Sequence, residues 1–101
     1  MITHIQNVQQ FDELLAKGDV LVDFFATWCG PCNMLTPVVE KLSEENPDLT
    51  VLKVDVDEIG DLAARYGVSS IPTLLYCKDG ELVDRGLGYM PLPRLKSFVR
   101  R

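Results

Sequence analysis

Residues 20–32 read VLVDFFATWCGPC, and this stretch decides the fold. Residues 20–26 are nearly all apolar, with many β-branched and aromatic side chains, as is typical of a strand covered on both faces. A run with helical periodicity starts at Asn33 and ends before Asn46. The stretch therefore predicts a strand, a tight turn and a helix, with two cysteines where the helix begins.

The spacing of Cys29 and Cys32 indicates a redox-active dithiol. Residues three apart at a helix start lie on one face, at a separation that a disulfide can bridge. The free N–H groups and partial positive charge of a helix N-terminus would stabilise a Cys29 thiolate, lower its pKa and make it a nucleophile. Pro31, with its fixed φ and no N–H, suits the first helical turn.

The same cysteine spacing also occurs in zinc sites, where four ligands close around the metal. The further ligands on offer here are His4 and Cys77, which lie far apart in the sequence and form no second closely spaced pair. The spacing therefore favours a redox pair with no bound metal. Cys77 is interpreted as a small core residue, with a third redox thiol as the lesser alternative.

Length and charge exclude several classes of protein. A chain of 101 residues with 47% apolar and 25% charged residues predicts one globular domain over 1–101. A net charge of −5 argues against a nucleic-acid partner, and the apolar runs are too short for a membrane span. The basic residues near the C-terminus are interpreted as cations that oppose a helix dipole; they are Arg94, Lys96, Arg100 and Arg101.

The N-terminal residues predict the cellular compartment. Residues 1–4 lack the charged segment and following apolar run of a signal peptide, so we expect a cytoplasmic protein. A Cys-x-x-Cys pair in that compartment is more often catalytic or metal-binding than structural. We also expect the protein to be a monomer.

Apolar periodicity and turn residues predict the order β-α-β-α-β-α-β-β-α. Asn7 is expected to cap the first helix, with Gln10 reaching back to it, and Asp79-Gly80 to form a hairpin turn. This order predicts an α/β fold, a mixed central sheet of about five strands flanked by four helices. The expected strands are 2–5, 20–26, 50–56, 73–78 and 81–87, and the helices are 8–17, 33–45, 61–66 and 91–101. The residues expected on the buried face of the second helix are Met34, Leu35, Val38, Val39 and Leu42.

Two charged residues interrupt the predicted buried strands. Asp23 lies among apolar neighbours, so burial should raise its pKa. Lys53 interrupts the run of residues 51–54. Each could instead be a strand-edge charge that faces water, and for Lys53 this alternative is stronger because its stem can snorkel. If the two strands are neighbours, Asp23 and Lys53 could face each other beneath Cys32.

Two further residues have alternative interpretations. Pro72 could simply begin a strand, and the sequence alone does not reveal whether the Ile71–Pro72 bond is cis. Trp28 could be a packing residue, or an aromatic side chain that shields the neighbouring thiol and contacts a substrate.

Several motifs of the chain, most of them described above, resemble those of the thioredoxin family. The resemblance covers nearly the whole chain, and its motifs agree in order and spacing. They are residues 22–32, Pro37, Lys53, residues 66–68, residues 71–74, Asp79-Gly80 and Gly88.

The resemblance implies the thioredoxin fold and the activity of a general protein disulfide reductase that contributes to electron transport and cell redox homeostasis. Cys29 would attack a substrate disulfide, and Cys32 would resolve the mixed disulfide and leave a Cys29–Cys32 disulfide. Asp23, modulated by Lys53, would accept or relay the proton of Cys32. No cofactor would be bound, and an NADPH-dependent thioredoxin reductase would restore the thiols.

The resemblance also implies a docking surface for disulfide-containing proteins. Pro72 would be cis, and the backbone around Ile71 would pair with an extended substrate segment. The apolar surface around it would consist of Trp28, Gly30, Pro31, Ile71, Pro72 and Gly88.

Three departures from the family pattern concern packing and partner preference. Phe25 stands where many members of the family have a second tryptophan. Asn33 stands where a Lys or Arg is common, and Tyr89 stands where the residue is usually small.

Two alternative functions remain at this point. One is an oxidase or isomerase of the same fold, and the other is a redox subunit or binding module of a larger complex.

Overall fold

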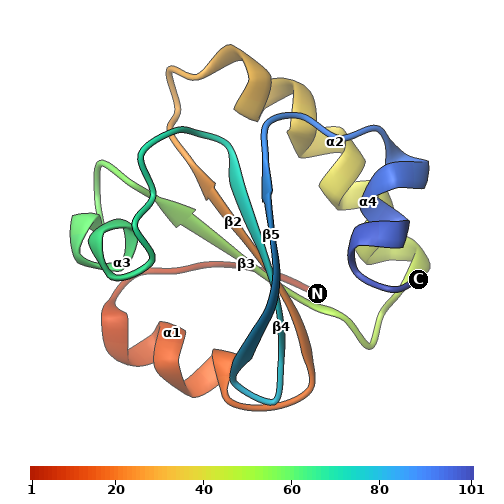
Figure 1. Cartoon of the computed structure of the whole chain (residues 1–101), viewed down its shortest axis with the longest axis horizontal. Helices are drawn as coiled ribbons and strands as arrows, with labels where there is room; N and C mark the ends of the chain where they lie inside the picture. Colours follow the sequence, from red (N-terminus) through yellow and green to blue (C-terminus); the bar gives the residue numbers. More distant parts are fainter.

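The computed structural model describes residues 1–101, and its elements follow the predicted order. Figure 1 shows a central sheet with helices on both sides. The strands are β1 (Ile2–His4), β2 (Asp19–Phe25), β3 (Thr50–Asp55), β4 (Thr73–Lys78) and β5 (Glu81–Leu87). The helices are α1 (Val8–Leu15), α2 (Gly30–Glu45), α3 (Gly60–Arg65) and α4 (Leu92–Phe98).

The sheet is mixed, as predicted, with β2 at its centre. Its strand order is β1-β3-β2-β4-β5. The first three strands in this order are parallel, whereas β4 is antiparallel to β2 and β5 to β4. The hairpin between β4 and β5 turns at Asp79 and Gly80, which both have positive φ, as a tight two-residue turn requires.

The sheet separates two apolar cores. Helices α1 and α3 cover one face, and α2 and α4 cover the other (Figure 1). Alternate residues of β2 point to opposite faces, so Val22 packs against the first pair of helices and Leu21 against the second. Asp23 shares the face of Leu21, which places its carboxylate beneath α2.

Two local predictions were wrong. Met34 is 62% exposed, because the buried stripe of α2 follows Cys32, Leu35 and Val39 and passes beside it. Asn7 caps α1 as predicted, with its Oδ1 accepting from the Gln10 N–H at 2.8 Å, but Gln10 Oε1 accepts from the Gln6 N–H rather than from the Asn7 N–H.

The helices are short or amphipathic. None of them combines the length and the apolar composition that crossing a lipid bilayer demands.

Candidate active site

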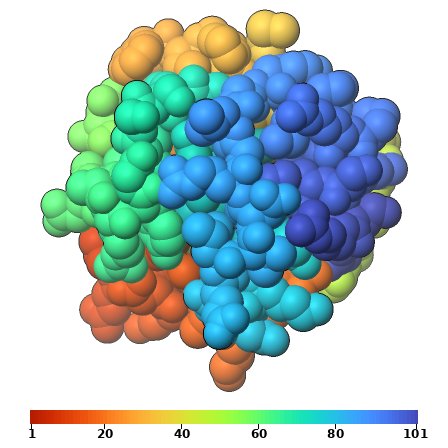
Figure 2. Space-filling model, viewed as in Figure 1, coloured from red at the N-terminus to blue at the C-terminus, as the bar shows by residue number.

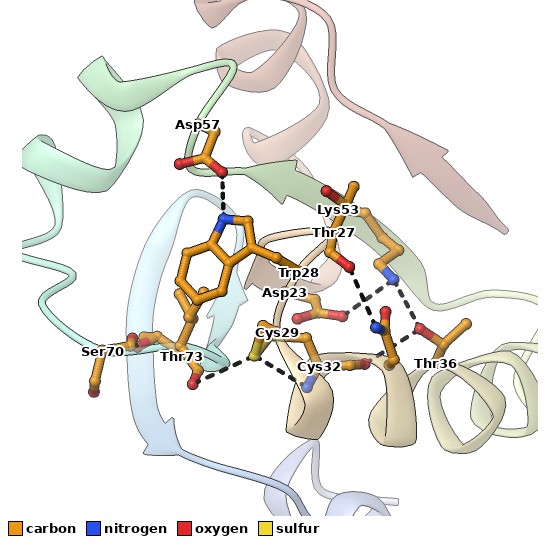
Figure 3. The surroundings of a disulfide bond; sticks show 12 residues. Asp23, Thr27, Trp28, Cys29, Cys32, Thr36, Lys53, Asp57, Ser70 and Thr73 are labelled. Atoms are coloured by element: carbon orange, nitrogen blue, oxygen red, sulfur yellow. Dashed lines mark hydrogen bonds and ion pairs between the residues drawn. A yellow bond between two sulfur atoms is a disulfide. The ribbon is translucent and has the colours of Figure 1, made fainter.

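The two cysteines lie where β2 passes into α2. Cys29 is the N-cap of α2 in an extended conformation, and its Sγ accepts a hydrogen bond from the Cys32 N–H at 3.3 Å (Figure 3). The two residues form a disulfide, with their Cα atoms 5.2 Å apart. Both are buried, Cys29 at 5% exposed and Cys32 at 2%. Gly30 and Pro31, the first residues of the helix, are exposed beside the disulfide.

A loop distant in sequence meets this disulfide. The Ile71–Pro72 peptide bond is cis, and Cys29 Sγ lies 3.9 Å from the Ile71 carbonyl oxygen. The Gly88 N–H donates to the Pro72 carbonyl at 2.9 Å, which fixes the loop to the end of β5. The N–H and C=O groups of Ile71 have no backbone partner, so both remain available. Ile71 is half-buried and Pro72 is buried.

Trp28 forms the exposed apolar border of the site. Its side chain is 71% exposed, and its Nε1 donates to Asp57 Oδ2 at 2.8 Å (Figure 3). Asp57 is positioned in turn by Asp55, whose Oδ1 accepts from the Asp57 N–H at 2.9 Å. A hollow of about 170 Å³ lies beside Trp28, lined also by Val56, Val68, Ser69, Ser70 and Ile71.

The two charged residues of the inner strands form a buried pair. Asp23 and Lys53 are register partners on β2 and β3, and Lys53 Nζ lies 3.6 Å from Asp23 Oδ2. Asp23 is 1% exposed and Lys53 is 7% exposed, so neither is a strand-edge charge that faces water. Neither oxygen of Asp23 accepts a hydrogen bond, which leaves the ion pair as the main compensation for burying it.

Lys53 connects this pair to the helix that carries the dithiol. Its Nζ donates to Thr36 Oγ1 at 3.5 Å, and Thr36 Oγ1 donates to the Cys32 carbonyl at 3.3 Å (Figure 3). Lys53 Nζ also lies 4.5 Å from the centre of the Phe25 ring, in a cation–π contact. Asp23 and Lys53 thus lie beneath the first turns of α2.

Burial dominates the ionisation of Asp23. Desolvation raises the pKa of this carboxyl from 3.8 to about 6, although the charge of Lys53 acts in the opposite direction. A carboxyl with this pKa changes its protonation state close to neutral pH, as many acid–base groups do.

The remaining cysteine and the histidine lie apart from this site. Cys77 is buried in the core between the sheet and the α1–α3 pair, where burial raises the pKa of its thiol. His4 is exposed at the end of β1 and packs edge-on against Phe25. No three His, Cys, Asp or Glu side chains of the structure converge on a point where a metal ion could bind.

The residues that meet at this site were predicted from the sequence, except for Thr36 and Asp57. For Asp57 a signal existed, because it follows β3 directly, and the carboxyl ends of neighbouring parallel strands lie at one edge of a sheet. For Thr36 the only signal was its position one helical turn after Cys32, and such a position does not by itself mark a functional residue.

Comparison with known proteins places this site in a family. A family model described as Thioredoxin matches residues 2–101. The chain belongs to the thioredoxin family. Its Cys29–Cys32 disulfide is the active-site pair of a thioredoxin, a protein-disulfide oxidoreductase.

Relatives from several lineages match over nearly the whole chain. Thioredoxin of Bacillus subtilis is 48% identical over 92% of this chain and 90% of its own length. Thioredoxin of Chlamydia trachomatis is 51% identical over 99% of this chain and 98% of its own length. Among solved structures, a mutant thioredoxin from Halobacterium salinarum superposes with a TM-score of 0.91 at 42% identity, over 97% of this chain and 87% of that one. Mitochondrial thioredoxin 3 from Saccharomyces cerevisiae, in its oxidized form, superposes with a TM-score of 0.90 at 37% identity, over 98% of this chain and 93% of that one.

Proposed function

We propose that the chain is a general protein disulfide reductase in which Cys29 is the nucleophile and Cys32 the resolving thiol. The Cys29 thiolate attacks one sulfur of a substrate disulfide, a mixed disulfide forms, and one substrate thiolate leaves. Cys32 then attacks Cys29 Sγ, the mixed disulfide breaks, and the second substrate thiolate leaves. Two electrons pass to the substrate, and the Cys29–Cys32 disulfide remains.

The observation that carries this proposal is the position of Cys29. Its Sγ accepts the N–H of Cys32 at the start of α2, where the helix dipole also favours a negative charge. The same interactions act on a thiolate in the reduced protein, and they favour Cys29 over Cys32, which lies one turn inside the helix. Exposed Trp28 adjoins Cys29 in the chain and offers an apolar contact to an approaching protein.

The loop before β4 supports a role in holding substrate. Because the N–H and C=O of Ile71 lack backbone partners, an extended substrate segment can pair with them as an added strand. The Ile71 carbonyl oxygen lies 3.9 Å from Cys29 Sγ, so a segment paired there would lie beside the disulfide. The proposed docking surface comprises Trp28, Gly30, Pro31, Ile71, Pro72 and Gly88.

Asp23 is proposed to take the proton of Cys32 during resolution. Cys32 must lose its proton to attack, and the nearby carboxylate has a pKa of about 6, so it accepts a proton readily near neutral pH. Lys53 modulates this group through the ion pair at 3.6 Å. We expect this proton transfer in the reduced protein to depend on both Asp23 and Lys53.

A thioredoxin reductase that draws on NADPH is proposed to restore the dithiol. Two electrons from NADPH pass through that enzyme to the Cys29–Cys32 disulfide and replace the two that the substrate received, so the chain itself needs no bound cofactor. We further propose that one monomeric domain over 1–101 performs the reaction, and that it works in the cytoplasm; fractionation of the source cells tests the location.

Insulin reduction tests the activity in two arms. With dithiothreitol as the electron source, the protein should accelerate precipitation of the insulin B chain, and Cys29→Ser should abolish the acceleration. With NADPH and a thioredoxin reductase, it should sustain NADPH oxidation over many turnovers. Activity with dithiothreitol but none with several reductases would contradict the proposed partner. Inactivity in both arms would favour a binding module whose thiols are not used.

A further inference from the structure

The ammonium group of Lys53 lies between two oxygen atoms. It is 3.6 Å from Asp23 Oδ2 and 3.5 Å from Thr36 Oγ1, and only the contact with Thr36 is a hydrogen bond (Figure 3). Another side of the ammonium faces the Phe25 ring, 4.5 Å from its centre. Because Lys53 is buried, a neighbouring side chain rather than bulk water has to satisfy its N–H groups.

The hydroxyl of Thr36 is oriented to accept from Lys53. Its hydrogen is donated to the Cys32 carbonyl oxygen at 3.3 Å, one turn earlier in α2. A hydroxyl has a single hydrogen, so the lone pairs of Oγ1 are left for the ammonium. Thr36 is half-buried, and its contact with Lys53 joins α2 to β3. Figure 2 shows the start of α2 in orange at the top of the molecule, and the buried pair of charges lies beneath it.

Thr36 and Asp23 thus compete for the same ammonium group. A hydrogen bond from Lys53 Nζ to the carboxylate would stabilise the charged form of Asp23 and lower its pKa. In the structure this hydrogen bond goes to the neutral hydroxyl instead, and the carboxylate senses only the positive charge at 3.6 Å. Burial is then the larger influence on Asp23, whose pKa is about 6.

No other ionisable side chain bonds to the Asp23–Lys53 pair. The residue of β4 opposite Asp23 is the apolar Leu74, and the two cysteines of α2 above it are joined in the disulfide. On the same face of the sheet, Asp55 follows Lys53 by two residues along β3, and His4 is the register partner of Lys53 on β1. Neither of them forms an ion pair or a hydrogen bond with the buried pair.

We propose that Thr36 is a positioning residue for the resolution step. Its hydroxyl holds the Lys53 ammonium away from the Asp23 carboxylate, so that the carboxylate stays basic enough to take the proton from Cys32 Sγ. This role depends on the proposed function of Asp23 as that acceptor. Threonine in helices often bonds to the carbonyl one turn earlier, so the tests separate a role in positioning Lys53 from a hydrogen bond that serves the helix alone.

The first test is the titration of the Asp23 carboxyl in the oxidised protein, followed by ¹³C NMR. Its signal is the one that Asp23→Asn lacks. Thr36→Val keeps the shape of the side chain but removes the hydroxyl, so Lys53 donates to the carboxylate, and the midpoint of the titration should fall by about 0.5 pH unit. Thr36→Ser keeps the hydroxyl and should retain the parent midpoint. Because the disulfide is intact, this measurement does not depend on reductase activity.

Two comparisons show whether the effect passes through Lys53. Thr3→Val is the matched control, because Thr3 lies opposite Leu52 on the face that α1 and α3 cover and makes no side-chain hydrogen bond. It should leave the midpoint unchanged. In a Lys53→Met background, Thr36→Val should no longer move the midpoint. A midpoint that stays or rises in Thr36→Val, or that falls equally in Thr36→Ser, would overturn the proposal.

The second test is the single-turnover reduction of a small disulfide, followed by stopped flow. The weaker base in Thr36→Val should slow the reaction about twofold at pH 7.5 and move the acid side of the pH–rate profile to lower pH. Thr36→Ser should react at the parent rate. Failure of the proposed function gives a different pattern: Asp23→Asn and Thr36→Val would both react at the parent rate although the midpoint had moved, and the positioning role would be overturned with it.

Discussion

The Asp23 carboxylate is buried with no hydrogen bond to either oxygen, and its charged partner is Lys53 at 3.6 Å. Its pKa of about 6 lies above the ordinary 3.8, so the native state binds the proton more tightly than the unfolded chain. The stability linked to that proton is present in full below the unfolded pKa and is lost as pH rises through about 6. Above that pH an ionised carboxylate remains in the core at a net cost.

Asp23→Ala should therefore stabilise the protein at neutral and alkaline pH. We expect a gain of about 1–2 kcal/mol in the free energy of unfolding at pH 8, and a smaller or reversed change at pH 4. Urea melts of both proteins across this range measure it. A variant less stable at every pH would mean that Asp23 is an ordinary packing residue.

The same substitution should slow resolution by Cys32, because its proton loses a nearby acceptor. Stopped-flow reduction of a small disulfide should show a variant about tenfold slower at pH 7, with the dependence on the group near pH 6 removed. A wild-type rate in the variant would remove Asp23 from the mechanism. Asp23→Asn is the conservative control, since it keeps the volume but cannot accept the proton.

Cys77 should be dispensable. It is 1% exposed, packs in the α1–α3 core, and burial raises the pKa of its thiol, so it has little thiolate to react. We expect Cys77→Ala to retain full insulin reduction and to lower the free energy of unfolding by about 1 kcal/mol. Lost turnover in a variant that melts like the parent would instead make Cys77 a participant.

At the residue scale, the functional candidates that the sequence revealed were charged side chains with apolar neighbours. Asp23 and Lys53 stood out because charges are rare inside apolar strands. Thr36, which contacts Lys53 and the Cys32 carbonyl, could not be predicted, since a threonine on a helix surface is unremarkable until the opposing strand is placed. The exact partners of Trp28 and Arg85 depend on loops whose paths the pattern does not specify.

At the scale of elements, most predicted boundaries lie within two residues of the observed ones, whereas the start of α2 and the end of α4 were each wrong by three residues. Some of the correct boundaries fall at residues with a physical reason to end an element. Gly67 follows α3 with positive φ, and Asp79-Gly80 separates β4 from β5. The error at Met34 has a physical cause as well. An apolar residue beside the buried stripe of α2 is indistinguishable by type from those within it, and only the direction of the helix relative to the sheet decides.

Two glycine substitutions should have opposite effects on stability. Gly86→Ala should destabilise by about 1 kcal/mol, because the new methyl group meets Met90 and Phe98 in a packed core. Gly60→Ala, at the first residue of α3, meets nothing within 4 Å and should stabilise by about 0.5 kcal/mol. Thermal melts of the two variants beside the parent give the comparison. Equal shifts of the melting temperature would show that the packing at Gly86 is looser than the structure indicates.

At the scale of the whole molecule, the fold brings the dithiol and the Ile71–Pro72 loop together. Periodicity predicted the elements and their order, but it does not determine that β2 lies between β3 and β4. That arrangement places the end of β2, the loop before β4 and the residues after β3 at one edge of the sheet. The resemblance to the thioredoxin family implied the thioredoxin fold, and the solved thioredoxin structures confirm that fold.

The central claim is that Cys29 attacks and Cys32 resolves, and covalent trapping tests it most directly. Reduced Cys32→Ser and Cys29→Ser variants are each mixed with a peptide disulfide, and intact mass is measured after acid quenching. Cys32→Ser should accumulate one peptide per protein through Cys29, while Cys29→Ser accumulates none. Equal trapping by the two variants, or trapping by Cys29→Ser alone, would contradict the account.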